Sequence, residues 1–366
     1  MTHLLDSDWF SRKHMIDYAW CLDIDGTLVT FEEPIEGASM FVKFLLIHEI
    51  PFVIISNTGQ KNRQEVASTL QRLLDVDIPP CRIFTACDQL SEYLIYNDCL
   101  YKTILVHGPN PQNYEHLLHM ENVYPLVSNG IYYTGESVSC VAIFFDGFLP
   151  DFYECLTQVA NFVICGAHLL VTSRDSSLMK RLNNHKWFKP GPGTFIAAIE
   201  EMVPNAVIKS FGKEQWASHM NHINDCLHTQ GFMGKSEQII IVGDKFDTDM
   251  SFGLKQGTKT CLVESGCDSE KSDHALNNKI DMVASSIKDI PLKVSEPMFE
   301  SDSYRETIQK FLRTKAIRCL NSVSANLSLS TKNITNLIDM INEKMESPPR
   351  RIKSLPARLD TLSDMT

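Results

Sequence analysis

The sequence predicts an α/β fold in which helices cover both faces of a parallel sheet. Short apolar runs of four to six residues alternate with longer segments whose apolar residues recur at helical spacing. Strands and helices in this order form βαβ units on a parallel sheet. The middle of the chain carries a second group of such elements, which predicts an inserted domain.

The elements of the first sheet are expected in two separate parts of the chain. The apolar runs predict strands at Tyr18–Leu22, Pro51–Ser56, Gln238–Val242 and Thr260–Val263. The amphipathic segments predict helices at Ala38–His48, Asn62–Leu74 and Asp249–Gln256. In the second of these helices, Val66 and Leu70 recur at the spacing of one helix face.

The middle block is expected to form its own small α/β unit. Its predicted strands are Lys102–His107, Val138–Phe145 and His168–Thr172, and its helices are Phe152–Asn161 and Thr194–Met202. We therefore divide the chain into a core domain (1–100), an inserted domain (101–207) and a second core part (208–296). The remaining residues, 297–366, are rich in Ser, Asn and Thr and are expected to be a largely disordered tail with one short helix near 334–345.

Composition excludes several classes of protein. The net charge of -11 and the pI of about 5.6 argue against a nucleic-acid binder, which needs a basic face. The eleven cysteines form no Cys-x-x-Cys pair, so reduced thiols are expected rather than disulfides or a zinc site. Charged residues interrupt every long apolar stretch, and the N-terminus is too acidic for a signal peptide. We expect a cytoplasmic protein with no membrane partner.

An acidic loop follows the first expected strand. Its sequence is Asp23-Ile24-Asp25-Gly26-Thr27, and in a parallel sheet such a loop faces the ligand cleft. Asp23 can attack phosphorus if a divalent cation cancels the repulsion, and Asp25 can protonate the leaving oxygen. Gly26 permits the sharp turn between them. The alternative is an acidic turn with Gly at its apex, which is common.

Three further signals follow in the chain. Ser56 and Asn57 end the second strand with a hydroxyl and a run of backbone N–H groups that suit phosphate oxygens. Lys213 comes after Val207-Ile208, where its ammonium can neutralise the phosphate and Asp23. The strand 238–242 runs into an acidic loop, Gly243–Asp249, whose oxygens suit Mg²⁺. Each signal alone has a structural alternative: an N-cap, a surface Lys or a helix cap.

With these four signals in one order, the sequence resembles the haloacid dehalogenase (HAD) superfamily. The motifs of that family are Asp-x-Asp-x-Thr, a Ser or Thr, a Lys, and Gly-Asp-x-x-x-Thr/Ser-Asp. A closer resemblance is to the type-IIA branch of 4-nitrophenyl, phosphoglycolate and pyridoxal phosphatases, through Pro34–Ala38, Phe145-Asp146 and Lys189–Thr194. The resemblance covers about residues 18–290. It implies a HAD-like Rossmannoid parallel-sheet core with an inserted C2-type α/β cap.

The resemblance also implies a role for each matching residue. Asp23 would be the nucleophile and a Mg²⁺ ligand, Asp25 the general acid/base and a ligand through its carbonyl, and Asp244 the third ligand. Ser56 would bind the phosphoryl group together with Asn57, Lys213 would balance charge, and Asp249 would support Lys213 or a metal-bound water.

Two positions depart from the family pattern. Glu214 stands where Pro usually follows the catalytic Lys, which predicts a looser turn and a weaker field. The cap strand ends in Thr172-Ser173-Arg174-Asp175 rather than Thr-Asn-x-Asp, and a basic loop, Ser176–Lys189, follows it. Arg174 and Arg181 are therefore candidate substrate-binding residues for an anionic or aromatic substrate. The alternative is a solvated basic loop.

These observations predict a Mg²⁺-dependent phosphatase that hydrolyses small phosphomonoesters through an aspartyl-phosphate. The expected partner is a small phosphorylated metabolite, and the branch suggests a homodimer through the cap. The alternative is a catalytically weak regulatory protein with the HAD fold that acts through residues 297–366.

Overall fold

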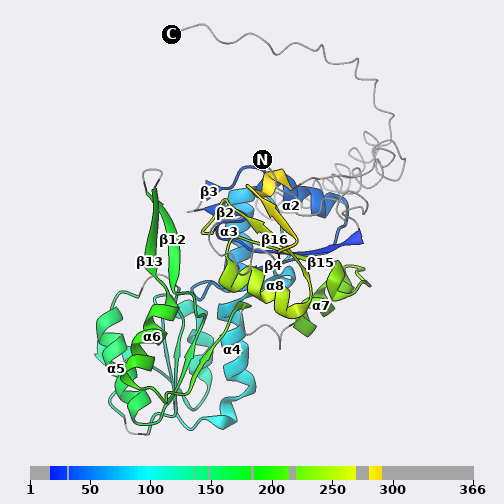
Figure 1. The fold of residues 1–366 in the computed structure, drawn as a ribbon. Helices are drawn as coiled ribbons and strands as arrows, with labels where there is room; N and C mark the ends of the chain where they lie inside the picture. Colours follow the sequence, from blue (N-terminus) through cyan, green and yellow to red (C-terminus); the bar gives the residue numbers. More distant parts are fainter. Residues whose placement is uncertain are drawn as a thin grey trace, which may run out of the picture. The chain divides into compact units, whose positions relative to one another are not determined.

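A computed structural model describes residues 17–30, 33–135, 137–146, 149–182, 185–213, 220–268 and 280–290 (Figure 1). All of these residues belong to one compact unit that ends at Val294. For 178–182 and 185–187 the description covers the backbone alone. The predicted tail, its expected short helix and Glu214 lie outside the described residues.

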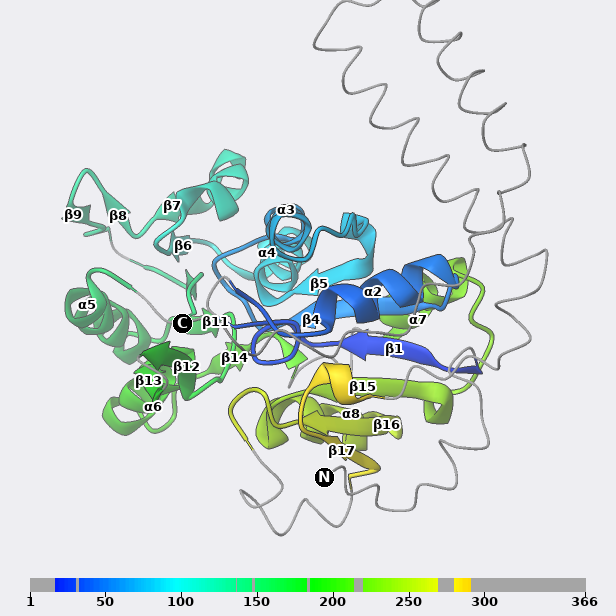
Figure 2. The same cartoon turned by 90° about the horizontal axis from the view of Figure 1, so that it is seen from above.

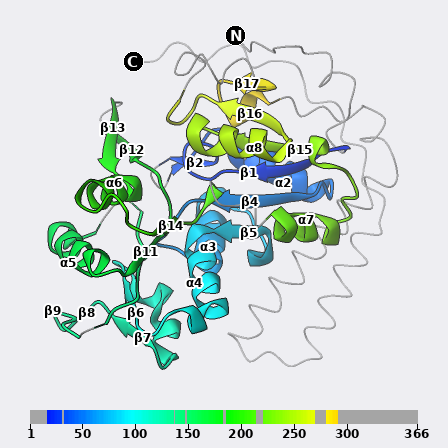
Figure 3. The same ribbon diagram turned by 60° about the horizontal axis from the view of Figure 1, so that its bottom comes forward.

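The first sheet has six parallel strands in the order β17-β16-β15-β1-β4-β5 (Figure 3). In chain order these strands are β1 (Ala19–Leu22), β4 (Phe52–Ser56), β5 (Ile83–Thr85), β15 (Ile239–Gly243), β16 (Lys259–Val263) and β17 (Met282–Ala284). The helices around it are α2 (Ala38–Ile47), α3 (Arg63–Leu74), α7 (Met220–Thr229) and α8 (Ser251–Gln256), with a π-helical turn, η8 (Phe246–Met250), leading into α8. The predicted α/β fold is confirmed.

Alternate residues of each strand feed two apolar cores, one on each face of this sheet. Trp20 packs edge-on against Phe41 of α2, with ring centroids 5.3 Å apart, and the same core includes Leu70 of α3. Cys21, the next residue of β1, belongs to the opposite core together with Ile223 of α7. Both faces are covered: α2 and α7 lie on opposite sides of the sheet in Figure 1, and Figure 2 looks down on the side that carries α2. This explains why these strands read as continuous apolar runs.

The second sheet has five parallel strands in the order β14-β11-β10-β6-β7. They are β6 (Ile104–His107), β7 (Val123–Pro125), β10 (Cys140–Ile143), β11 (His168–Val171) and β14 (Ile208–Ser210). Helices α5 (Phe152–Ile164) and α6 (Pro192–Met202) share an apolar core with one face. The opposite face packs against α4 (Ala86–Tyr96) through Leu90 and Leu94.

The second sheet therefore draws on residues beyond the predicted boundaries at 101 and 207. Helix α4 precedes the first boundary, and β14 follows the second. The apolar pattern of α4 shows that the helix has a buried side but does not show which sheet covers that side. The assignment of domains stays a prediction.

Three antiparallel hairpins complete the strands: β2 (Val29–Thr30) with β3 (Glu33–Pro34), β8 (Val127–Ser128) with β9 (Ile131–Tyr132), and β12 (Ser177–Leu182) with β13 (His185–Pro190). Short 3₁₀ turns occupy Pro80–Arg82, Asp98–Leu100, Pro111–Asn113, Glu115–His119, Ser236–Gln238 and Ile287–Asp289. The segment expected to be a basic loop, Ser176–Lys189, is thus mostly hairpin. Among the described helices, none combines the length and apolarity required to cross a bilayer.

Helix α3 begins with a complete capping box. Oδ1 of Asn62 accepts hydrogen bonds from the backbone N–H groups of Gln64 and Glu65, both at 3.0 Å. The Glu65 carboxylate accepts one in return from the N–H of Asn62, also at 3.0 Å. These bonds satisfy N–H groups that the helix itself leaves unpaired.

We expect Asn62→Ala to lower the free energy of unfolding by about 1 kcal/mol, because the Oδ1 acceptor is lost. Urea denaturation followed by circular dichroism measures this change. Asn62→Ser, which can still cap the helix, should retain most of the stability. Equal stability of the Ala variant and the wild type would contradict the capping role.

Candidate active site

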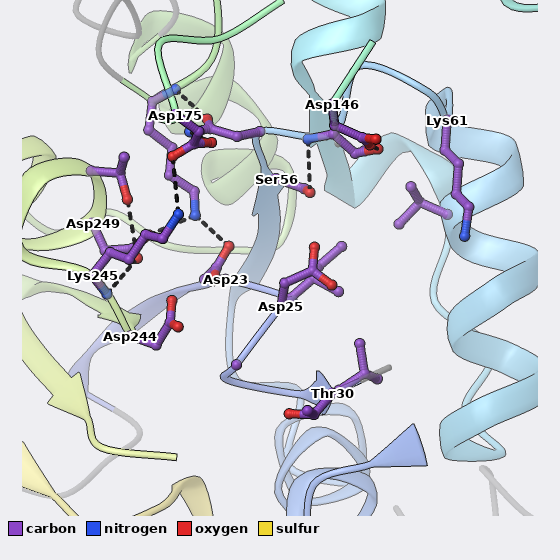
Figure 4. A pocket seen from close by; sticks show the side chains of 18 of the residues that line it. Asp23, Asp25, Thr30, Ser56, Lys61, Asp146, Asp175, Asp244, Lys245 and Asp249 are labelled. Atoms are coloured by element: carbon purple, nitrogen blue, oxygen red, sulfur yellow. Dashed lines mark hydrogen bonds and ion pairs between the residues drawn. The ribbon is translucent and has the colours of Figure 1, made fainter. Parts of the chain in front are cut away.

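A cavity of about 370 Å³ collects the polar residues that follow strands of both sheets (Figure 4). From the first sheet come Asp23 after β1, Ser56 at the end of β4 and Asp244 after β15. From the second sheet come residues that follow β10, β11 and β14, namely Asp146, Asp175 and Lys213. Ligands bind at the carboxyl ends of parallel strands, and here two such ends line one cavity.

The loop after β1 turns sharply around Gly26. The N–H of Asp23 still bonds to the carbonyl of Val242 at 2.9 Å, so the nucleophile candidate is held by the sheet. Gly26 has a φ of 82°, which only glycine adopts without strain. A Cβ at Gly26 would also lie 2.2 Å from the Asp244 carboxylate. Both the turn and the close approach therefore require glycine here.

The Lys213 ammonium is buried between two carboxylates. Its side chain is 3% exposed, and Nζ donates to Oδ1 of Asp23 and, at 2.6 Å, to Oδ1 of Asp249. Burial lowers the pKa of Lys213, but the two carboxylates outweigh this effect and raise it above its ordinary value. The lysine is therefore charged. Burial also raises the pKa of Asp23 well above its usual range, although Lys213 opposes that rise.

The segment after β4 offers a hydroxyl to the cavity. The N–H of Thr58 donates to Oγ of Ser56 at 3.2 Å, which leaves the Ser56 hydroxyl hydrogen free to donate to a ligand. The Asn57 side chain serves as a connector. Its Oδ1 accepts from the backbone N–H of Lys213 at 2.8 Å, and its Nδ2 donates to Asp175 at 2.9 Å. Only the second amide hydrogen and the backbone of Asn57 remain for a substrate.

Four charged residues of the cavity were not predicted as site residues: Lys61, Asp146, Asp175 and Lys245. Asp146 accepts a hydrogen bond from the Thr58 hydroxyl at 2.9 Å. Asp175 is buried and accepts one from the Lys245 ammonium at 3.3 Å, while Lys245 also donates to the carbonyl of Ser177 at 3.0 Å. Asp146 and Asp175 both follow apolar runs of the predicted middle block, which is the same signal that identifies Asp23. The same signal therefore applies at the ends of strands in the second sheet.

The two arginines expected to bind substrate have different outcomes. Arg174 does not line the cavity, since its guanidinium pairs at 3.1 Å with Glu200 of α6. It directly precedes Asp175, and of these two neighbours only Asp175 lines the cavity. The side chain of Arg181 lies outside the described residues, so its role stays a prediction.

Asp25 remains accessible to solvent through the cavity, yet protein atoms surround it closely. This partial removal from bulk water raises the pKa of Asp25, and the Asp146 carboxylate raises it further, against the effect of nearby lysines. A carboxyl group with a raised pKa is suited to donate a proton.

The carboxylates of Asp23, Asp244 and Asp249 form a cluster that fits a hard cation. One oxygen from each lies within 4.8 Å of the others, and all three side chains are buried. Within the described part of the chain, Oδ2 of Asp23 and Oδ1 of Asp244 accept no hydrogen bond, so both are available as ligands. Both oxygens of Asp249 accept bonds, from Lys213 and from the N–H of Lys245. Asp249 is therefore placed to support its neighbours, as the sequence suggested.

The pKa of Asp244 is raised by its place in this cluster. Burial, followed by the nearby Asp249 carboxylate, raises the pKa of Asp244 to about 7, although the N–H of Cys267 donates to it at 2.7 Å. Three buried carboxylates face the single Lys213 ammonium in this cluster. A divalent cation bound by these carboxylate oxygens would offset the excess negative charge.

The sequence of this chain matches known families over most of the described region. Residues 20–120 match the profile of the haloacid dehalogenase-like hydrolases, and residues 187–290 match a second profile of HAD-like hydrolases. The chain belongs to the HAD-like hydrolases. The predicted family is thereby confirmed. Six of the motif residues line the cavity, namely Asp23, Asp25, Ser56, Lys213, Asp244 and Asp249.

Relatives of this HAD-like hydrolase include proteins that are named as phosphatases. It is 26% identical over 278 residues to an acid sugar phosphatase of Staphylococcus haemolyticus, which covers 76% of this chain and 95% of the relative. The 4-nitrophenylphosphatase of Thermotoga maritima superposes with a TM-score of 0.58 at 21% identity, covering 77% of this chain and all of that one. Glycerol phosphate phosphatase of Mycobacterium tuberculosis, solved with magnesium, gives 0.56 at 15% identity over 75% and 78% of the two chains. The two structures show the shared fold.

We expect Asp244→Asn to stabilise the metal-free protein at about pH 8 by about 1–3 kcal/mol. The folded pKa of Asp244, about 7, lies above the unfolded value of about 4. The unfolded chain therefore releases this proton first, and stability falls as the pH rises through that window. Asn carries no charge at any pH and avoids the loss.

Urea denaturation in EDTA measures the effect, and a repeat with Mg²⁺ provides the control. Mg²⁺ should stabilise the wild type more than the variant, because the variant lacks one carboxylate ligand. A variant that is less stable than the wild type in EDTA at about pH 8 would contradict this electrostatic account.

Proposed function

We propose that this protein is a Mg²⁺-dependent phosphatase that hydrolyses small phosphomonoesters through an aspartyl-phosphate on Asp23. The observation that carries the proposal is the shared cavity, in which Asp23 and Asp25 lie beside the phosphate-binding candidate Ser56 and the buried cation Lys213 (Figure 4). The relatives named above are phosphatases, which supports the same reaction class.

In the first step the Asp23 carboxylate attacks phosphorus. The bond between Asp23 and phosphorus forms as the bond from phosphorus to the leaving oxygen breaks. Asp25 gives its proton to that oxygen, a task for which its raised pKa is suited. Ser56 donates its hydroxyl hydrogen to a phosphoryl oxygen, and Lys213 offsets the negative charge beside Asp23.

In the second step water attacks the phosphorus of the aspartyl-phosphate. Asp25, now ionised, takes the proton of that water, and the bond between phosphorus and Asp23 breaks to release inorganic phosphate. Asp23 and Asp25 return to their starting states, so the cycle closes without any other reactant.

Mg²⁺, held by Asp23 and Asp244 with the backbone carbonyl of Asp25, would offset the repulsion between the Asp23 carboxylate and the phosphate dianion. The free oxygens of Asp23 and Asp244 support this choice of ligands. Asp249 would keep Lys213 in place beside them.

A small substrate suits the cavity. Its volume of about 370 Å³ lies at the lower end of ordinary ligand sites. The relatives named above are an acid sugar phosphatase, a 4-nitrophenylphosphatase and a glycerol phosphate phosphatase, and these names support a small substrate. Cytoplasmic residence and a homodimer through the cap stay predictions. The regulatory alternative depends on residues 297–366, outside the described part, and the phosphatase relatives do not support it.

We expect Asp23→Asn to reduce hydrolysis of 4-nitrophenyl phosphate with Mg²⁺ on the order of a thousandfold or more, because the nucleophile is lost. Release of 4-nitrophenol measures the rate. Asp247→Asn is the matched control, since Asp247 is an exposed carboxylate of the same acidic loop outside the cavity. Equal rates for Asp23→Asn and the wild type would refute the proposed mechanism.

We expect Asp175→Ala to lower kcat/KM about tenfold, because it removes the carboxylate partner of the Lys245 ammonium and releases the Asn57 amide that holds Lys213. Steady-state kinetics on the same substrate measures this loss. Arg174→Gln is the control at the neighbouring residue. Arg174 pairs with Glu200 of α6 and does not line the cavity, so this substitution should leave kcat/KM unchanged. A larger effect of Arg174→Gln than of Asp175→Ala would reverse this assignment.

A further inference from the structure

Three lysines line the cavity, and they differ in their partners. Lys213 pairs with Asp23 and Asp249, and Lys245 pairs with Asp175. Lys61 is half-buried and, within the described part of the chain, makes neither a hydrogen bond nor an ion pair. Lys61 lies close enough to Asp25 for its positive charge to lower the pKa of that carboxyl group. A cation held in a cavity without a bonded partner is available to an anionic ligand.

Lys61 lies on the side of Asp25 that faces away from the other two lysines. In Figure 4, Asp25 stands between Asp23 and Lys61, while Lys245 lies on the opposite side near Asp249. Lys61 is positioned by the chain just before α3, where Asn62 caps the helix. Its backbone is therefore fixed by the capping box.

The proposed reaction assigns this side of the cavity to the leaving group. Asp23 attacks from one side of phosphorus, and the leaving oxygen departs on the opposite side, roughly in line. Asp25 protonates that oxygen, so the rest of the leaving group must extend beyond Asp25. Lys61 lies in that direction (Figure 4).

The residues on this side differ in how far a ligand can reach them. Leu73 of α3 and Thr30 at the end of β2 line the cavity and are half-buried, whereas Val66 and Leu70 of α3 belong to the core of the first sheet. The hydroxyl of Thr69 is already bonded to the carbonyl of Glu65 at 2.8 Å. The Asp146 carboxylate also lies on this side (Figure 4), where it accepts a hydrogen bond from the Thr58 hydroxyl. Among the described residues, Lys61 is thus the cation that this side offers to a short carbon chain ending in a negative group.

We propose that Lys61 selects phosphomonoesters whose leaving group carries a second anionic group, either a carboxylate or a second phosphate. This inference rests on the proposed function, because it uses the direction in which the leaving group departs. A positively charged leaving group is disfavoured by Lys61, and a neutral one leaves the ammonium without a partner.

The test compares substrates that differ only in the second anion. 3-Phosphoglycerate and glycerol 3-phosphate share a skeleton and differ in a carboxylate against a hydroxymethyl group. Fructose 1,6-bisphosphate and fructose 6-phosphate make the same comparison for a second phosphate. The wild type should favour the member that carries the second anionic group in at least one pair. The pair that shows the preference identifies the anion.

Lys61→Gln should reduce that preference, measured as the ratio of kcat/KM within a pair, by about tenfold or more, mainly through a higher KM. Lys61→Arg keeps the positive charge and should retain most of the preference. Lys43→Gln is a matched control, because Lys43 pairs with Asp75 on the surface and does not line the cavity. Thermal unfolding of each variant establishes that it is folded.

Each other outcome has a definite meaning. Equal losses on both members of a pair would overturn the inference, since Lys61 would then serve the phosphoryl group that all substrates share. A wild type that prefers the neutral member of both pairs would overturn it as well. If no phosphomonoester, including 4-nitrophenyl phosphate, is hydrolysed, the proposed function itself fails, which is distinguishable from a failure of the selectivity alone.

Discussion

A charged ammonium buried between two carboxylates holds the centre of this molecule together. Lys213 follows a strand of the second sheet, whereas Asp23 follows a strand of the first and Asp249 lies in the π-helical turn after β15. An ammonium that is 3% exposed cannot remain charged without such partners, because the loss of hydration costs several kcal/mol. The ends of both sheets must therefore meet around Lys213.

The backbone around Lys213 is fixed in the same way. Its N–H donates to Asn57 at the end of β4, and the N–H of Gly212 donates to Gln89 of α4 at 2.9 Å. Gln89 and Asn57 both lie in the first half of the chain, while Lys213 comes more than a hundred residues later. Contacts between distant segments thus set the position of the Lys213 ammonium, and the orientation of Asp23 depends on that position.

The buried carboxylates of the cluster lower the stability of the fold when they are ionised. Burial raises the pKa values of Asp23 and Asp244 because ionised carboxylates lose hydration there. Such strain is typical of sites whose charges are arranged for a ligand rather than for stability. Under the proposed function, the two uncommitted oxygens would bind a cation, and the glycine at position 26 lets Asp244 approach the Asp23 loop. The second sheet adds Asp146 and Asp175, whose bonds to Thr58 and Asn57 tie the segment after β4 to that sheet.

The fold class, the family and the motif residues could all be predicted from the sequence alone. Continuous apolar runs identify β1, β4 and β15 because both faces of the sheet are buried. The residues after these strands reach the cavity because the carboxyl ends of parallel strands lie at one edge of the sheet. Asp23, Ser56, Lys213 and Asp244 could therefore be named without coordinates.

How the two sheets share their elements depends on packing between segments that are distant in the chain. Helix α4 has an apolar face that would suit either sheet, and its assignment to the second one depends on packing with Leu90 and Leu94. The same is true of Arg174 and Asp175: they are neighbours in the chain, yet one pairs with Glu200 and the other lines the cavity. Partners of this kind are far apart in the sequence, and local periodicity carries no information about which distant side chain a charge will meet. The isolation of Lys61 beyond Asp25 is likewise visible only when the cavity is assembled.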